Sequence, residues 1–138
     1  MRSFSVVILA LLGTVALGGT WQVSETDAFG WRRALITAGD DRLAVVCPPN
    51  APPFAVPVTA GGNQGPAGRV TLGLEIDGER HDQPMLCSEL LCEAELPPAT
   101  WRALAAGGTV TVWIDDRRGP TFPLAGSAAA LAACDPHY

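Results

Sequence analysis

Four cysteines behind an apolar leader constrain the fold of this chain more than any other feature. They are Cys47, Cys87, Cys92 and Cys134. The chain opens with one positive charge, Arg2, continues as an apolar run, and reaches small residues that end at Gly18. This pattern is typical of a secretory signal, so we expect residues 1–18 to be cleaved. An even number of cysteines in an exported chain predicts two disulfides.

The leader also bears on membrane attachment and location. Its apolar core is only about a dozen residues long, whereas a membrane span needs roughly 20. We therefore expect no membrane span after cleavage of the signal, and a periplasmic or secreted protein. The remaining residues, 19–138, have the length of one domain with one core.

Three pairings of the four cysteines are formally possible. Cys87 and Cys92 are close enough in the sequence for a tight turn to bring them to bonding distance, which leaves Cys47 for Cys134. The loop-entropy model gives about 4.6 kcal/mol for the long bridge and about 2 kcal/mol for the short one. Zinc ligation would need further ligands at suitable spacing, and a thioredoxin-like pair has two intervening residues. We predict two disulfides, no metal and no cofactor.

The charge balance is acidic. The net charge is -5, and the basic residues form no cluster larger than Arg32-Arg33 and Arg117-Arg118. A negative domain without a basic patch argues against nucleic acid as a partner.

Alternation of apolar and polar residues predicts a mainly β protein. The clearest case is residues 70–77, where Val70, Leu72, Leu74 and Ile76 share one face. Residues 42–47, 90–96 and 109–115 alternate in the same way, and less regular candidates lie within residues 20–25, 31–38 and 117–126. Proline gives no ladder hydrogen bond, so we expect an edge strand at residues 53–58, followed by a long exposed loop at 60–68.

Two short helices are predicted near the C-terminus. Residues 97–108 begin with prolines, which suit a first helical turn, and end at Gly107. In residues 126–134, Ser127 is a candidate N-cap, and Leu131 and Cys134 lie on one side. The prediction is a small antiparallel β-sandwich or partly open barrel with two short helices, held by disulfides.

Several segments resemble the invasion-associated locus B family of exported bacterial proteins. They are VTLGLEIDG, PMLCSELLCEAEL, WRALAAGGTVTV and FPLAGSAAALAAC. Leu43 to Cys47 and Ala130 to Cys134 also look like small exported proteins associated with type VI secretion. The chain departs from the first family because no cysteine follows Trp21 closely. The resemblance implies an exported, cysteine-stapled β domain of the cell envelope, without known catalytic residues.

Residues suited to catalysis are few. The serines outside the leader are Ser24, Ser88 and Ser127, and none stands in a nucleophile-elbow motif. His81 lies in a polar segment that we interpret as a turn, and His137 is close to the chain end. The acidic pairs Asp40-Asp41 and Asp115-Asp116 are more typical of solvated turns than of a catalytic dyad.

Contact residues are the better functional lead. Trp113 lies on the strand face opposite Val112 and Ile114, so either the sheet is covered on both sides or this indole is exposed. Leu90 and Leu91 occupy the tip between the short-bridge cysteines. We therefore expect a non-enzymatic envelope-accessory or protein-binding module with an unknown protein partner. The alternatives are a secreted enzyme inhibitor, or a small hydrolase that uses an acidic pair.

Overall fold

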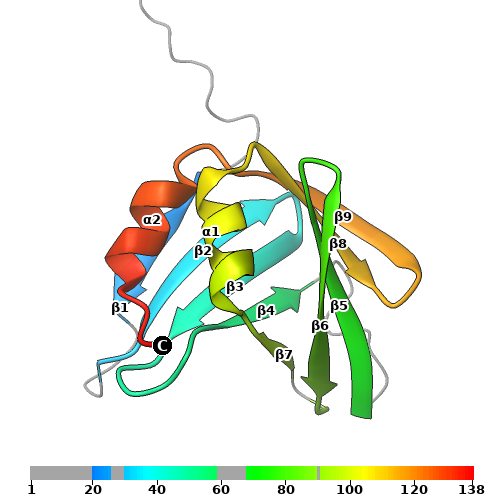
Figure 1. The fold of residues 1–138 in the computed structure, drawn as a ribbon, viewed down its shortest axis with the longest axis horizontal. Coiled ribbons are helices and arrows are strands. Elements are labelled where there is room, and N and C mark those ends of the chain that lie inside the picture. The colour runs from blue at the N-terminus through cyan, green and yellow to red at the C-terminus, as the bar shows by residue number, and fades with distance from the viewer. Residues whose placement is uncertain (1–19, 26–29, 59–67, 90) are drawn as a thin grey trace, which may run out of the picture.

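Nine antiparallel strands form one sheet in the computed structural model, which describes residues 20–25, 30–58, 68–89 and 91–138. Their order across the sheet is β1-β2-β3-β4-β7-β6-β5-β8-β9 (Figure 1). The strands are β1 (Gln22–Glu25), β2 (Arg32–Ala38), β3 (Asp41–Cys47), β4 (Phe54–Val58), β5 (Gly68–Ile76), β6 (Glu79–Cys87), β7 (Cys92–Glu95), β8 (Thr109–Ile114) and β9 (Arg117–Pro123). The predicted signal, residues 1–18, and most of the predicted loop at 60–68 lie outside the described residues.

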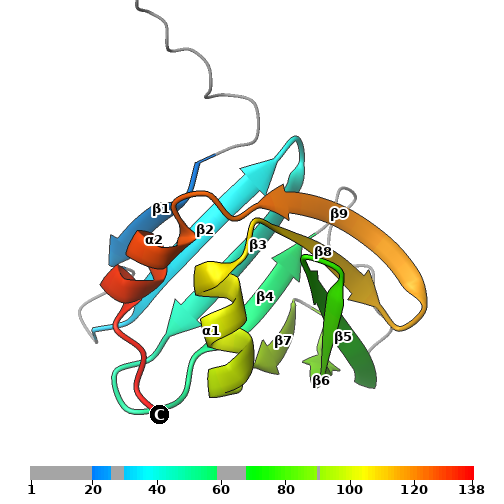
Figure 2. The same ribbon diagram turned by 45° about the horizontal axis from the view of Figure 1, so that its top comes forward.

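The sheet is open and curls around the two helices, α1 (Pro98–Ala106) and α2 (Ser127–Cys134) (Figures 1 and 2). Its two ends approach each other, because β2 contacts β9 and the indole Nε1 of Trp21 donates a hydrogen bond to the carbonyl of Pro123 at 3.2 Å. The mainly β fold with two short helices and an open sheet agrees with the prediction from the sequence.

The concave face of the sheet carries the core. On β5 the side chains of Leu72, Leu74 and Ile76 are buried, and on β8 those of Val110 and Val112. The residues between them on β5 face the other side of the sheet, as the period of two requires. The core is completed by residues of both helices, including Leu104 of α1 and Leu131 of α2.

The helices begin and end largely where the sequence predicts. Helix α1 has Pro98 in its first turn and ends at Gly107, whose N–H donates to the carbonyl of Ala103 at 2.9 Å. Helix α2 differs from the prediction, because its N-cap is Gly126, with φ of 86°, and not Ser127. The Ser127 hydroxyl instead donates to the carbonyl of Leu104 at 2.7 Å and ties the two helices together.

Both cysteine pairs are those predicted from the sequence. Cys47 at the end of β3 bonds Cys134 at the end of α2, with Cα atoms 5.8 Å apart. Cys87 and Cys92 face each other across the β6–β7 hairpin and form the second bond. The first bridge therefore fixes the last helix to the sheet, and the second closes the base of a hairpin.

Two further predictions from the sequence are wrong. Residues 53–58 do not form an edge strand, because β4 lies between β3 and β7. Its pairing with β7 covers only Phe54 and Ala55, so Pro57 lies in the part of β4 that is paired with β3 alone. His81 is not in a turn but within β6, where it lies opposite Leu74.

No helix in the described part of the chain is both long enough and apolar enough to cross a membrane.

Candidate binding surface

The convex face of the sheet is divided into an apolar and a polar half. On β2, β3 and β4, the convex side chains are mostly apolar and half-buried or buried. With Trp31, which precedes β2, they form what we call the outer apolar face: Trp31, Leu35, Ala44, Val46, Phe54 and Val56. On β5, β6 and β8 the same side carries charged or polar groups such as Glu75, Arg80 and Asp82.

Strand register places the outer apolar face in rows that cross the strands. Leu35, Ala44 and Val56 stand opposite one another in one row. In the next row, Arg33 of β2 lies opposite Val46, Val46 lies opposite Phe54, and Phe54 lies opposite Glu95 of β7. The second row is therefore apolar in the centre and carries opposite charges at its two ends.

A hollow of about 360 Å³ adjoins this face where the strands end. The rings of Trp31 and Phe54 meet edge to face in its wall, with centroids 6.2 Å apart and an interplanar angle of 76°. Pro48, Pro49 and Pro52 line the rest of it together with Asn50 and Ala51. A smaller hollow of about 110 Å³ shares two of these prolines and reaches Arg32, His137 and the Cys47–Cys134 bridge.

The β6–β7 hairpin projects two exposed leucines. Leu86 is 59% exposed and Leu91 is 40% exposed, so both rank among the four most exposed large apolar side chains of the described residues. The turn is held by the Ser88 N–H, which donates to the Leu91 carbonyl at 2.8 Å, and by the disulfide behind it. Leu90, the other leucine predicted at this tip, lies outside the described residues.

Trp113 is half-buried and has partners within the fold. Its Nε1 donates to the Glu75 carboxylate at 2.8 Å, and the Arg80 guanidinium lies 5.1 Å from the centre of its ring. Arg80 also pairs with Asp82 at 2.6 Å, and it lies over Gly73, where a Cβ would come within 2.5–2.8 Å of the guanidinium. The indole is therefore half-covered by charged neighbours on its own sheet.

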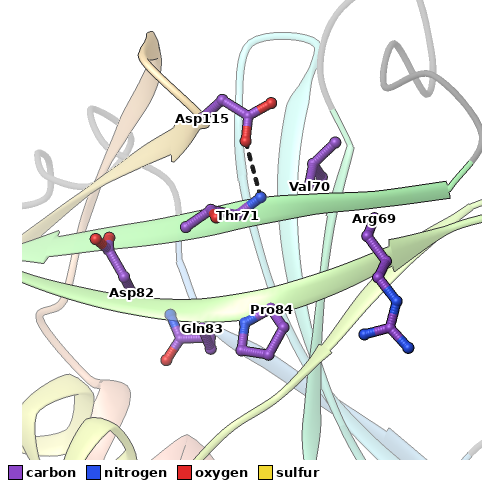
Figure 3. A pocket seen from close by; sticks show the side chains of 7 residues that line it. All are labelled: Arg69, Val70, Thr71, Asp82, Gln83, Pro84 and Asp115. Carbon is purple, nitrogen blue, oxygen red and sulfur yellow. Dashed lines mark hydrogen bonds between the residues drawn. The ribbon is translucent and has the colours of Figure 1, made fainter.

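A third hollow, of about 410 Å³, opens beside this cluster over β5 and β6 (Figure 3). Asp82 of β6 and Asp115, one member of the Asp115-Asp116 pair, both line it. No histidine is among its lining residues. Figure 3 shows Asp115 reaching from the β8–β9 turn to the backbone N–H of Thr71, at 2.9 Å. Because Asp82 is paired with Arg80, both carboxylates already have partners within the fold.

One polar residue that sequence reasoning missed is Gln83. It is buried on the concave side of β6, where its amide nitrogen donates to the carbonyls of Leu72 at 3.0 Å and His81 at 2.8 Å. Its amide oxygen accepts a hydrogen bond from the Thr100 hydroxyl at 3.3 Å, which joins the sheet to α1. These contacts give Gln83 a role in the fold.

The outer apolar face was missed as well, although the run Ala44-Val45-Val46 is a signal that both faces of β3 are apolar.

The fold and its surfaces define a disulfide-stapled, open antiparallel sheet that holds two helices on its concave side. Comparison of the chain with protein-family models, with curated proteins and with solved structures gives no significant match. Among the described residues, no group of three or more His, Cys, Asp and Glu side chains is placed to hold a metal ion.

Proposed function

We propose that this protein is a non-enzymatic, exported binding module of the cell envelope, and that it engages a protein partner through the β6–β7 hairpin. The observation that carries the proposal is a pair of exposed leucines on this hairpin, Leu86 near the end of β6 and Leu91 in the turn that the disulfide closes. The resemblance to the invasion-associated locus B proteins points the same way, because that family is exported and stapled by cysteines.

The hairpin is suited to binding because its shape is fixed in advance. An exposed apolar side chain gains free energy when a partner covers it, and a rigid turn loses little conformational entropy on binding. The Cys87–Cys92 bond and the hydrogen bond between Ser88 and Leu91 restrict the turn before any partner arrives. Exposed charged residues, Glu89 and Glu93, flank the leucines and provide a polar rim.

A hydrolase that uses an acidic pair has less support. Asp115 accepts a backbone hydrogen bond and Asp82 pairs with Arg80, so each carboxylate stabilises the β5–β6–β8 region. A general acid or base must also lie within hydrogen-bond reach of the proton that it transfers, with its carboxyl free for that role. The hollow that contains these two carboxylates has no histidine in its lining.

Site-specific photo-crosslinking in cells that make the protein tests the proposal. A photoreactive amino acid replaces Leu91 in one variant and Leu86 in another, and adducts are identified by mass spectrometry. We expect the same protein adduct from both positions. A matched control carries the photoreactive group at Glu79, which is exposed at the other end of β6, and should give no such adduct.

A substitution series separates hairpin binding from incidental contact. Leu91→Asp should abolish the adduct formed from position 86, whereas Leu91→Met, which keeps the apolar surface, should preserve it. If neither hairpin position yields an adduct, or if Leu91→Asp leaves the adduct from position 86 unchanged, the proposal fails. If the captured partner is an enzyme that loses activity when this protein binds it, the binding module acts as an enzyme inhibitor.

A further inference from the structure

We propose that the outer apolar face is a self-association surface, on which a second copy of this chain docks in a two-fold dimer. The inference goes beyond the proposed function, because it uses β2, β3, β4 and one residue of β7 rather than the β6–β7 hairpin tip. It rests on one row of side chains whose pattern is complementary to itself.

The row consists of Arg33, Val46, Phe54 and Glu95, each directly opposite the next across neighbouring strands. Arg33 and Glu95 are exposed, while Val46 and Phe54 are half-buried. With three strand spacings of roughly 4.8 Å each, the two charges stand about 14 Å apart. The row is thus basic at one end, apolar in the middle and acidic at the other end.

Neither end of the row forms an ion pair within the described part of the chain, although the Glu95 carboxylate lies near Tyr138. No hydrogen bond or ion pair there involves the Arg33 guanidinium or the Glu95 carboxylate. The apolar residues in the middle face away from the core, because the core cluster and the side chains packed against it include neither Val46 nor Phe54. Both helices lie on the opposite, concave side of these strands (Figure 2).

A two-fold axis that lies in the interface, parallel to the strands, places every residue of the row opposite a complementary residue of the other copy. Such an axis reverses the row, so that Arg33 of each copy meets Glu95 of the other and Val46 packs on Phe54. Stacked sheets lie roughly 10 Å apart, a gap that one arginine and one glutamate side chain can bridge together. An axis across the strands would instead place Arg33 on Arg33, which like-charge repulsion disfavours.

The same arrangement uses the neighbouring row. Ala44 of β3 and Val56 of β4 are also opposite each other, so reversal places Ala44 of one copy against Val56 of the other. Ala44 is only 8% exposed although it points away from the core, because larger side chains surround it. A face of about four strands by five residues covers roughly 19 Å by 17 Å, or about 320 Å² on each copy. This is smaller than the roughly 800 Å² per partner of a standard interface, so we expect a weak dimer with a dissociation constant in the upper micromolar range.

Sedimentation analysis of the purified, disulfide-bonded protein over a wide concentration range tests this inference. The wild type should pass from monomer to dimer as its concentration rises. Arg33→Glu alone and Glu95→Arg alone should each raise the dissociation constant about tenfold or more, because each creates two like-charge contacts per dimer. The double variant, Arg33→Glu with Glu95→Arg, restores both pairs and should return to within about threefold of the wild type.

Arg117→Glu is the matched control. It makes the same charge change at an exposed position at the start of β9, which is separated from β7 by three strands of the sheet, and should leave the dissociation constant unchanged. The inference is wrong if the wild type stays monomeric at every concentration. It is also wrong if a dimer forms but the double charge reversal weakens it further instead of restoring it. Crosslinking at Leu91 is a separate measurement, so failure here leaves the proposed function standing, and the reverse also holds.

Discussion

Tyr138 is the only tyrosine of the chain, and it is held against the fold close to the C-terminus. Its hydroxyl donates to the carbonyl of Leu96 at 2.9 Å, and its ring meets Trp101 edge to face at 6.4 Å. Burial raises the pKa of Tyr138 to about 12, and the Glu95 carboxylate adds to the rise while Arg102 opposes it. The neutral phenol is therefore the form that the folded protein favours.

An ultraviolet titration of tyrosinate should show this directly. We expect a midpoint near pH 12 in the folded protein, and near pH 10, the usual tyrosine pKa, after unfolding. Because the folded state holds the proton more tightly, stability should fall as the pH rises from about 10 to about 12. Tyr138→Phe should remove the tyrosinate signal and this part of the alkaline loss of stability. A folded-state midpoint near pH 10 would contradict the docking of this ring.

Individual residues differ in how far their sequence context predicts their place. Both disulfides could be predicted, because only one pair of cysteines is close in the sequence and the other pair then follows. The environment of Trp113 could not be predicted, since it depends on Arg80 and Glu75 from two other strands. The prediction that Ser127 is the N-cap of α2 was wrong, because its hydroxyl donates to the Leu104 carbonyl of α1 instead.

At the scale of elements, the contact between α1 and α2 depends on one buried hydroxyl. Ser127 is 1% exposed, and its hydroxyl donates to the Leu104 carbonyl at 2.7 Å. If the helix continued, the backbone N–H of Gly108 would donate to the Leu104 carbonyl. It donates instead to the Asp77 carboxylate at 3.0 Å. Leu104 would thus keep a buried carbonyl without a donor if Ser127 were changed.

Ser127→Ala should lower the free energy of unfolding by about 1–3 kcal/mol, the usual effect of leaving a buried carbonyl unsatisfied. Denaturant unfolding measures the loss. Ala129→Ser places a hydroxyl on an exposed position of the same helix and should change stability by less than about 0.5 kcal/mol. Equal effects of the two changes would show that helix propensity, and not the contact with α1, determines the result.

Element prediction succeeded where one face alone is apolar and failed where polar residues face inward. Strands β5 and β8 alternate cleanly, and the structure confirms both. Strand β6 was missed, because Gln83 occupies a core position that the pattern rule reserves for apolar residues. Its amide is satisfied by three hydrogen-bond partners from β5, β6 and α1, which no local pattern records.

At the scale of the whole molecule, the two disulfides have different roles. Cys47–Cys134 joins residues 87 positions apart and connects the sheet to the last helix, whereas Cys87–Cys92 spans 5 positions within one hairpin. Loop entropy predicts a stabilisation of about 4.6 kcal/mol for the long bridge and about 2 kcal/mol for the short one.

Replacing each pair by alanine should reproduce that order. The variant without Cys47 and Cys134 should lose about 2–5 kcal/mol of unfolding free energy, and the variant without Cys87 and Cys92 should lose less. Chemical denaturation of both variants beside the wild type gives the comparison. The short-bridge variant should also bind its crosslinked partner less well, since its hairpin is no longer fixed. A larger loss from the short bridge would contradict the loop-length argument.

The two ends of the open sheet meet at a seam, where Trp21 and strand β2 approach β9. Trp21, which precedes β1, is 8% exposed and belongs to the core, and its indole N–H donates to the Pro123 carbonyl at the end of β9. Helix α2 contacts β1, β2 and β3 and lies in front of β1 and β2 in the view of Figure 1. Because β1 is a short outermost strand with β2 as its one neighbour in the sheet, its place depends largely on Trp21 and α2.

Opening of the seam should be the lowest-energy local unfolding of this sheet. Trp21→Ala should cost about 3–5 kcal/mol, as expected for a buried aromatic side chain. Trp21→Phe keeps most of the apolar contact but removes the N–H donor, so it should cost less and act locally. By hydrogen exchange, Trp21→Phe should speed exchange in β1 and at the end of β9, while β5 and β6 in the centre of the sheet stay protected. If exchange rose equally in every strand, the sheet would unfold as a unit, and its two ends would not form a separate seam.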